Sequence, residues 1–286
     1  MTPKKTALVV CGPTAGGKSD LADALAERLT EKEGRYVPTL AVDSMQVYRE
    51  LPVITNQARR RPAELVGIIS VTEEWTVAKH KARAEELISE VATFVLDAGT
   101  GMYLNAILLD IPLAPKVSPE LRRWAEEAAA GEPNPRRAAR AKELELAGAE
   151  GRGSIWQGDL RYDTAVVYLR PERHELDAAI HERSRLITRD GPHEAERLGG
   201  MAKAGERISP QVMDSVGVRE LVGHLSGVLS LQQAHERISI RTSRLARRQM
   251  RWFDKLVRTL DGRARVTVLD SPYKRNLHNM HDIIGL

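Results

Sequence analysis

The chain has 286 residues and a single cysteine, which excludes an internal disulfide and suits a reducing compartment. Hydrophobic residues make up 42% of it but aromatic residues only 4%, so we expect a sizeable core filled mainly by leucine, valine, isoleucine and alanine. The net charge of +4 fits either a polyanionic partner or a solvated surface of mixed charge. Because no apolar run approaches the roughly 18 residues of a membrane span and residues 1–5 lack a signal-peptide pattern, we expect a cytoplasmic protein.

The first predicted element is a strand over Ala7–Val10, and a glycine-rich loop follows it. This loop, Gly12–Ser19, fits the pattern G-x-x-x-x-G-K-[ST] and precedes a helix-like run, Asp20–Leu29, which is the context that a phosphate-binding loop needs. Glycines let backbone N–H groups converge on phosphate oxygens, and the helix N-terminus adds its positive dipole end. The loop therefore predicts a polyphosphate site in which Lys18 reaches the outer phosphates and Ser19 holds Mg²⁺.

Further apolar runs alternate with helix-like runs along the chain. This alternation predicts an α/β protein with a P-loop NTPase-like, three-layer parallel sheet, a short helical insertion and a helical C-terminal third. The remaining strands are expected at Thr39–Val42, Thr93–Leu96, Thr164–Leu169 and, as an edge strand, Val266–Leu269. The helices are expected at Thr76–Val91, from Ser118 onward, and at Arg136–Leu146, Glu172–Arg189, His193–Ala204, Pro210–Leu225 and Ser230–Leu256.

A polar segment, Asp43–Arg49, directly follows the second predicted strand. The carboxyl ends of parallel strands gather at one edge of a sheet, so Asp43 is expected beside the phosphate loop. There it would either bind Mg²⁺ through water or act as a general base, while Ser44 and Gln46 carry donors and acceptors suited to the edge of a base. An equally supported interpretation is that Asp43 and Ser44 cap a following helix.

The third predicted strand is followed by the segment Asp97–Tyr103, in which two glycines flank Thr100. Glycines at these positions allow the backbone and the threonine hydroxyl to approach a phosphate closely. Taken alone, however, the segment is more typical of a plain turn from a strand into a helix.

The last long helix is rich in arginine. Spacings of three, four and seven residues place several arginines on one face, which can neutralise the phosphates of a nucleic acid. A solvated basic face is the more common explanation of such a run, and Trp252 and Phe253 either stack on bases or anchor the helix. The arginines are Arg237, Arg241, Arg244, Arg247, Arg248 and Arg251.

Together, these segments resemble the tRNA dimethylallyltransferase (tRNA isopentenyltransferase) family. The combination is far more specific than the phosphate loop alone, and the matches follow the family's order from residue 7 to about residue 256. The matching stretches are Gly12–Ser19, Asp43–Arg49, Gly99–Leu104 and Arg244–Phe253, with weaker matches at Asn134–Arg137, Arg140–Leu144 and Ser215–Glu220.

The resemblance implies an enzyme that transfers a dimethylallyl group from dimethylallyl pyrophosphate to the exocyclic amine of an adenine in tRNA next to the anticodon. It implies Mg²⁺ as the cofactor, tRNA and dimethylallyl pyrophosphate as partners, no membrane, and a monomer. Asp43 would accept the amine proton, while Lys18 and Thr100 would stabilise the charge on the leaving pyrophosphate. The implied pyrophosphate contacts are Gly12, Thr14, Ala15, Gly16, Gly17, Lys18 and Ser19, the metal ligand is Ser19, and the adenine or RNA contacts are Ser44, Gln46, Arg241, Arg244, Arg248 and Gln249.

The chain departs from the family pattern at several positions. Ala98 replaces the first of two usual glycines, Ile54–Ala58 replaces a Gly-Thr-Ala-Lys-Pro element, and the usual His-His-Leu segment is missing near Val66–Ile69. Asp214 stands where the family commonly has an arginine that contacts pyrophosphate. A carboxylate there would repel pyrophosphate, so either a neighbour such as Arg219 substitutes, or the alignment slips, or catalysis is weakened.

Three alternatives stay open at this point. Prenyl transfer to free adenine nucleotides fits an insertion that is shorter than usual, although the arginine-rich helix favours RNA. A P-loop small-molecule kinase explains the loop and a lid-like insertion but not the segment Asp43–Arg49. An RNA-binding protein without catalysis would account for Ala98 and Asp214.

These observations divide the chain into four parts. Residues 1–115 form the first part of the phosphate-loop core, and residues 116–150 form the short helical insertion. Residues 151–262 complete the core and supply a helical RNA-binding part, and residues 263–286 form an edge strand and a loose tail.

Overall fold

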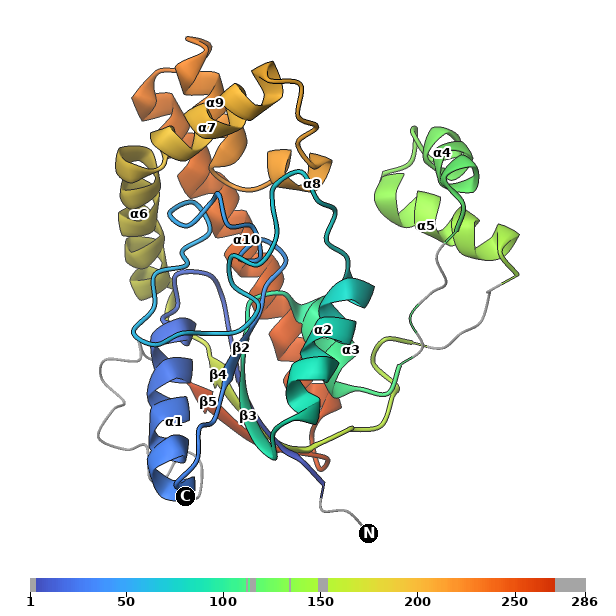
Figure 1. The fold of residues 1–286 in the computed structure, drawn as a ribbon, viewed down its shortest axis with the longest axis vertical. Coiled ribbons are helices and arrows are strands. Elements are labelled where there is room, and N and C mark those ends of the chain that lie inside the picture. The colour runs from blue at the N-terminus through green and yellow to red at the C-terminus, as the bar shows by residue number, and fades with distance from the viewer. Residues whose placement is uncertain (1–3, 112, 114–116, 134, 149–153, 271–286) are drawn as a thin grey trace. The chain divides into compact units, whose positions relative to one another are not determined.

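The computed structural model describes residues 4–111, 113, 117–133, 135–148 and 154–270 (Figure 1). The chain forms two compact units, one of residues 1–108 with 160–286 and the other of residues 109–159. The predicted insertion, 116–150, lies within the second unit. Residues 271–286 of the predicted tail lie outside the described residues. No helix in the described part of the chain is long and apolar enough to cross a membrane.

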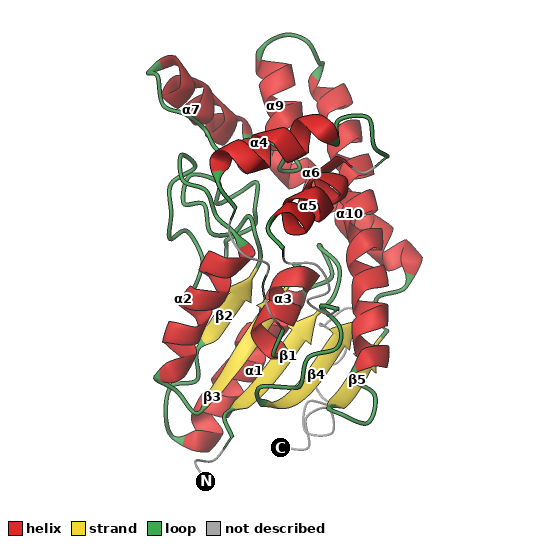
Figure 2. Cartoon of the chain, turned by 90° about the vertical axis from the view of Figure 1, so that its right-hand side faces the viewer, coloured by secondary structure: helices red, strands yellow, loops and turns green. Residues whose placement is uncertain are grey.

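The first unit is built on a five-stranded sheet in the order β2-β3-β1-β4-β5, with every neighbouring pair parallel (Figure 2). In the register of the central strands, Thr6 lies beside Thr93 on one side and Asp163 on the other. This confirms the predicted parallel sheet and its edge strand. The strands are β1 (Thr6–Cys11), β2 (Thr39–Val42), β3 (Thr93–Ala98), β4 (Asp163–Leu169) and β5 (Arg265–Leu269).

Helices cover both faces of this sheet, with α1 on one side and α2 and α3 on the other, which gives the predicted three layers (Figure 1). The core beneath α1 is aliphatic, as its composition predicted, and includes Leu8, Leu21, Leu25 and Val95. The helices of this unit are α1 (Lys18–Glu33), α2 (Val77–Ser89), α3 (Gly101–Leu108), α6 (Arg173–Asp190), α7 (Pro192–Lys203), α8 (Pro210–Met213), α9 (Val218–Leu225) and α10 (Leu231–Thr259).

The prediction of one continuous helix over Pro210–Leu225 is wrong, because two short helices, α8 and α9, occupy this segment. Gly217 separates them with a φ of 104°, which a right-handed helix cannot contain. The side chain of Glu220 then accepts a hydrogen bond of 2.9 Å from the Gly217 N–H, so α9 begins with its own cap.

The second unit contains two helices, α4 (Pro119–Ala128) and α5 (Pro135–Leu146). The predicted helix start is confirmed, because the Ser118 side chain accepts a hydrogen bond of 3.2 Å from the Leu121 N–H and Pro119 opens the helix. Small alanines, among them Ala125 and Ala139, pack between the two helices. The two ends of this unit lie next to each other, because the Asp110 N–H donates a hydrogen bond of 2.8 Å to the Asp159 carbonyl.

Candidate active site

The loops that follow β2 and β3 meet at one edge of the sheet. The N–H groups of Gly99 and Thr100 donate to the Val42 carbonyl at 3.1 and 3.0 Å, and the Ser44 N–H donates to Thr100 Oγ1 at 3.2 Å. The phosphate loop leaves β1, which lies next to β3, at the same edge. The structure thus brings together the three segments that the sequence placed after separate strands.

The phosphate loop connects β1 directly to α1, whose first residue is Lys18. Lys18 Nζ folds back over the loop and donates to the Pro13 carbonyl at 2.8 Å. Burial lowers the pKa of Lys18, while the carboxylates of Asp97 and Asp43 act to raise it. The ammonium therefore lies in the field of both carboxylates, where an incoming phosphate would compete for it.

A buried network of charged side chains holds the Ser19 hydroxyl in place. The Ser19 hydroxyl donates to Asp97 Oδ2 at 2.7 Å, and the same oxygen accepts Arg59 Nη1 at 2.8 Å. Arg59 Nη2 also donates to Asp23 Oδ1 at 2.8 Å, and all three charged side chains are at most 5% exposed. The sequence analysis assigned no role to this network. The only feature of the sequence that could have indicated it is the carboxylate of Asp97 within an otherwise apolar strand.

The oxygens of Ser19 and Asp97 suit the magnesium ion that the sequence predicted. Mg²⁺ is usually held by one or two protein oxygens together with phosphate oxygens and water. No group of three or more metal-ligating side chains occurs among the residues described, so phosphate oxygens would have to complete the shell. The donor set fits a metal bound together with a phosphorylated ligand.

Asp43 directly follows β2 at this edge of the sheet, and its two oxygens have different surroundings. Oδ1 accepts hydrogen bonds from the N–H groups of Met45 and Gln46 at 2.7 and 3.3 Å. Oδ2 faces Gly99, where a Cβ would come within 2.7 Å of it. Over residues 43–76 the described backbone contains no helix, so the alternative that Asp43 caps a following helix is wrong; it stabilises a turn instead.

Gln46 turns its amide toward the next loop. Its Nε2 donates to the carbonyls of Thr55 and Asn56 at 3.2 and 3.1 Å. That loop is in turn fixed by Glu194 of α7, whose carboxylate accepts the N–H groups of Val53 and Ile54 at 2.6 and 2.9 Å. The segment Ile54–Ala58, which departs from the family pattern, is thus held in place beside the site by several hydrogen bonds.

Arg183 of α6 is a cation that sequence reasoning missed. Burial lowers its pKa to about 10, although the nearby Asp43 carboxylate acts to raise it. Its Nη2 donates to the Ile54 carbonyl at 2.9 Å, and in the described residues it pairs with no carboxylate. Its charge also acts to lower the pKa of Lys18. An amphipathic helix pattern gives no sign that this one arginine turns into the site.

Asp214 is neutralised by a neighbour. Its carboxylate forms an ion pair with Arg219, so the residue expected as a substitute cation is engaged with Asp214 itself. Arg241 donates to the Asp214 carbonyl at 2.6 Å and to Glu220 Oε1 at 2.7 Å. The negative charge at position 214 is therefore offset locally.

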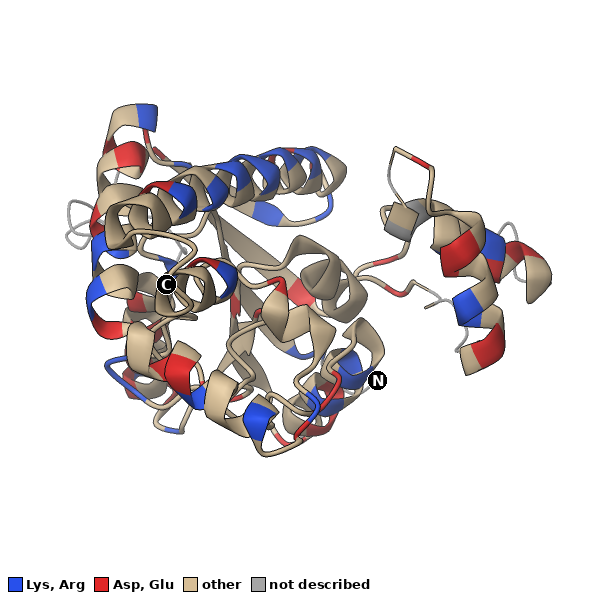
Figure 3. Cartoon of the chain, turned by 90° about the horizontal axis from the view of Figure 1, so that it is seen from above, with Lys and Arg blue, Asp and Glu red and all other residues tan. Residues whose placement is uncertain are grey.

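Helix α10 is tied to the phosphate loop by Gln249. Its Oε1 accepts the Thr14 N–H at 2.8 Å, and its Nε2 donates to the Gly99 carbonyl at 2.9 Å. Arg244 and Arg248, also predicted as RNA contacts, are exposed on the same helix. Lysine and arginine recur along this long helix (Figure 3).

The fold and this edge of the sheet define a phosphate-loop α/β protein whose loop is joined to a long basic helix. A family model described as IPP transferase matches residues 46–256 of the chain. The chain belongs to the IPP transferase family.

Named relatives agree with this assignment. The tRNA dimethylallyltransferase of Rubrobacter xylanophilus is 61% identical to the chain, covering 97% of it and 98% of the relative. That of Anaeromyxobacter dehalogenans is 33% identical, covering 87% and 91%. Among solved structures, the full-length tRNA isopentenylpyrophosphate transferase of Bacillus halodurans shares the fold, with a TM-score of 0.67, 22% identity and coverage of 98% and 95%. A eukaryotic dimethylallyltransferase acting on tRNA has a TM-score of 0.72 at 20% identity, covering 96% and 76%.

Proposed function

We propose that this protein transfers a dimethylallyl group from dimethylallyl pyrophosphate to the exocyclic amine of an adenine in tRNA next to the anticodon. In this step the amine nitrogen forms a bond to the allylic carbon, the carbon–oxygen bond breaks, and pyrophosphate leaves with the electron pair. The amine proton is lost to a base. Family membership and the arrangement of the sheet edge support the proposal.

The observation that carries the proposal is the position of Asp43. Its Oδ2 lies against Gly99, whereas its Oδ1 is held by two backbone N–H groups. An oriented carboxylate next to a phosphate loop suits proton removal from the amine as the allylic bond breaks. A kinase would need a base that activates a hydroxyl, and it would have no use for a basic helix bound to its phosphate loop.

The leaving pyrophosphate would be bound by the phosphate loop and by Lys18, together with Thr100 from the loop after β3. Bound Mg²⁺ would supply positive charge against the departing oxygens. Ser19 and Asp97 would hold that ion. Charge stabilisation of this kind is the largest contribution that a fixed, buried site makes to such a reaction.

Arg183 is our candidate for the cation that replaces the usual arginine at position 214. Its charge interacts with those of Asp43 and Lys18, and it pairs with no carboxylate in the part of the chain described. It also has donors to spare after bonding the Ile54 carbonyl. A half-buried guanidinium of this kind favours a bound anion. The proposal therefore does not require weakened catalysis.

The acceptor would be an unstacked adenine, since a base in a helix cannot reach the edge of this sheet. Ser44 and Gln46 would contact its edge, and Arg241, Arg244 and Arg248 with Gln249 would line the RNA side. A tRNA acceptor supports a cytoplasmic location.

The test is incubation of the purified protein with dimethylallyl pyrophosphate, Mg²⁺ and an anticodon stem-loop RNA, followed by mass analysis of the nucleosides. We expect dimethylallyl-adenine in the RNA and one pyrophosphate released for each group transferred. Adenosine monophosphate in place of RNA tests the free-nucleotide alternative. Absence of prenylated RNA, with the wild-type protein folded and RNA present in excess, would contradict the proposal.

A variant separates the proposed base from a merely structural carboxylate. Asp43→Asn keeps one acceptor for the turn and removes the basic oxygen, so turnover should fall by at least about 100-fold. Binding of RNA should change little. Turnover close to that of the wild type would remove Asp43 from the role of base.

A further inference from the structure

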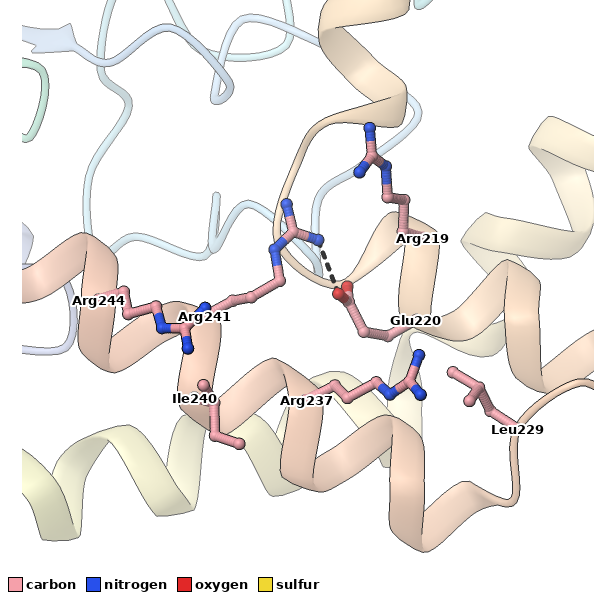
Figure 4. A pocket seen from close by; sticks show the side chains of 7 residues that line it. All are labelled: Arg219, Glu220, Leu229, Arg237, Ile240, Arg241 and Arg244. Carbon is pink, nitrogen blue, oxygen red and sulfur yellow. Dashed lines mark hydrogen bonds and ion pairs between the residues drawn. The ribbon is translucent and has the colours of Figure 1, made fainter. Parts of the chain in front are cut away.

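An open pocket of about 310 Å³ lies between α9 and α10, and none of its lining residues is assigned to the chemical step (Figure 4). Three of its arginines come from α10 and one from α9, and the turn between these helices adds a leucine. Arg237 extends toward that leucine, Leu229. The lining residues are Arg219, Glu220, Leu229, Arg237, Ile240, Arg241 and Arg244.

Two of the four arginines are fixed by carboxylates and two are not. Arg219 pairs with Asp214, and Arg241 pairs with Glu220, whose side chain is only 5% exposed. Arg237 and Arg244 have no carboxylate partner among the described residues. The pocket therefore has an excess of positive charge, with one pair of guanidinium groups held rigidly and one pair available to an anion.

The pocket is not purely polar. Leu229 is buried in its wall, and Ile240, which is 52% exposed, offers an apolar surface next to Arg237 and Arg244. Apolar side chains together with flat guanidinium groups are the surfaces on which proteins stack unpaired bases. A bare phosphate would use the arginines but leave this apolar surface exposed, so the lining favours a nucleotide.

The pocket also lies close to the phosphate loop along one rigid element. Arg244 precedes Gln249, which bonds the loop at Thr14, by five residues, or about 7.5 Å of helix. Arg237 is about 18 Å from Gln249 on the same scale. A strand of RNA advances about 3.4 Å per stacked nucleotide, so these distances span only a few nucleotides.

We propose that this pocket, which we name the α9–α10 pocket, binds one unstacked nucleotide of the RNA substrate, a few positions from the adenine that is modified. Arg237 and Arg244 contact its phosphates, and Leu229 and Ile240 contact its base. Arg219 and Arg241 are positioning residues that shape the pocket. This inference rests on the proposed function only for the identity of the RNA.

The test is equilibrium binding of a fluorescent anticodon stem-loop RNA without dimethylallyl pyrophosphate, using a series in which each loop nucleotide in turn is abasic. For the wild type, we expect one abasic position other than the target adenine to weaken binding by about tenfold, the size of one base-stacking interaction. Ile240→Ala, which removes the exposed apolar surface proposed for the base, should show a smaller loss at that position. The double variant Arg237→Ala/Arg244→Ala should bind intact RNA more weakly. Its salt slope should fall by about 0.7 for each phosphate that the variant no longer neutralises.

Arg247→Ala is the matched control, because Arg247 is exposed on the same stretch of α10 but does not line the pocket. This control should keep the tenfold abasic penalty, and thermal melting should show all variants folded. A wild type that is insensitive to every abasic position, an Ile240→Ala variant that keeps the full penalty, or a double variant with an unchanged salt slope would overturn the inference. If the wild type shows the penalty but forms no dimethylallyl-adenine, the proposed function fails while the pocket stands.

Discussion

Gly99 lies where two functional side chains approach the backbone closely. A Cβ at this position would be 2.7 Å from Asp43 Oδ2 and 3.6 Å from Gln249 Nε2. We predict that Gly99→Ala lowers kcat by about 100-fold, because displacing a catalytic group by about 1 Å has that effect. Quenched time courses at saturating RNA and dimethylallyl pyrophosphate measure kcat. The control Gly199→Ala, in α7 with open space around its Cβ, should leave kcat unchanged.

A second residue-scale prediction concerns the buried network around Arg59. Arg59→Met leaves the carboxylates of Asp23 and Asp97 buried without their cation, which should lower the free energy of unfolding by about 3–5 kcal/mol in urea titration. Adding Asp23→Asn and Asp97→Asn to the same chain should restore part of the lost free energy of unfolding, since the uncompensated charges disappear. Arg35→Ala, which breaks a surface pair with Glu33, should cost less than about 1 kcal/mol. Equal losses for Arg59→Met and Arg35→Ala would contradict this account.

The sequence predicted only part of the site, and it gave no role to Asp97, Arg59 or Arg183. The phosphate loop and Asp43 were predictable because each directly follows an apolar strand, and strand ends meet at one sheet edge. Arg59 follows no strand, and Arg183 sits within an ordinary amphipathic helix. Their place in the site depends on the path of a long loop and on the rotation of α6, which only tertiary packing fixes.

At the scale of elements, all five strands were predictable. Four of them contain runs of buried, mainly aliphatic residues, and β5 is a partly exposed edge strand in which two valines alternate with polar residues. Helix boundaries were less predictable. The apolar spacing from Pro210 to Leu225 suits one helix, but the positive φ of Gly217 divides it. That division matters for function, since the cap of α9 uses Glu220, which also holds Arg241.

A buried histidine on α2 leads us to predict that the stability of the protein depends on pH. His80 is fully buried on this helix, and its Nδ1 accepts a hydrogen bond of 3.0 Å from Trp75 Nε1. Burial lowers the pKa of His80 from 6.5 to about 4, so only the unfolded state gains this proton between those values. The free energy of unfolding should therefore fall as pH drops, by about 2–3 kcal/mol from this group between about pH 7 and about pH 4.5.

Urea unfolding at both pH values, for the wild type and for His80→Gln, isolates this contribution from the titration of carboxylates. Glutamine keeps an acceptor for the Trp75 N–H and cannot titrate. The pH-dependent loss should be smaller in the variant by about 2 kcal/mol. If both proteins lose the same stability, the buried histidine is not the source.

At the scale of the whole molecule, the proposed chemistry draws on the first unit alone. The phosphate loop, Asp43, Thr100, Arg183 and Gln249 all lie within residues 1–108 and 160–286. The second unit leaves and rejoins the chain at one place, where Asp110 and Asp159 are joined by a backbone hydrogen bond of 2.8 Å. A short connection can therefore close the first unit with little loss of chain entropy.

We predict that replacing residues 112–157 by a short glycine–serine linker leaves the sheet folded and keeps the affinity for dimethylallyl pyrophosphate within about threefold, which is less than 1 kcal/mol. Thermal melting and calorimetric titration in the presence of Mg²⁺ measure the two effects. Lys18→Ala in the full chain is the matched control, because it should stay folded and lose donor affinity. A shortened protein that melts cooperatively yet no longer binds the donor would mean that the insertion supplies part of the donor site. In that case the sheet edge alone would not explain pyrophosphate binding, and the roles given to Lys18 and Arg183 would need a partner from residues 109–159.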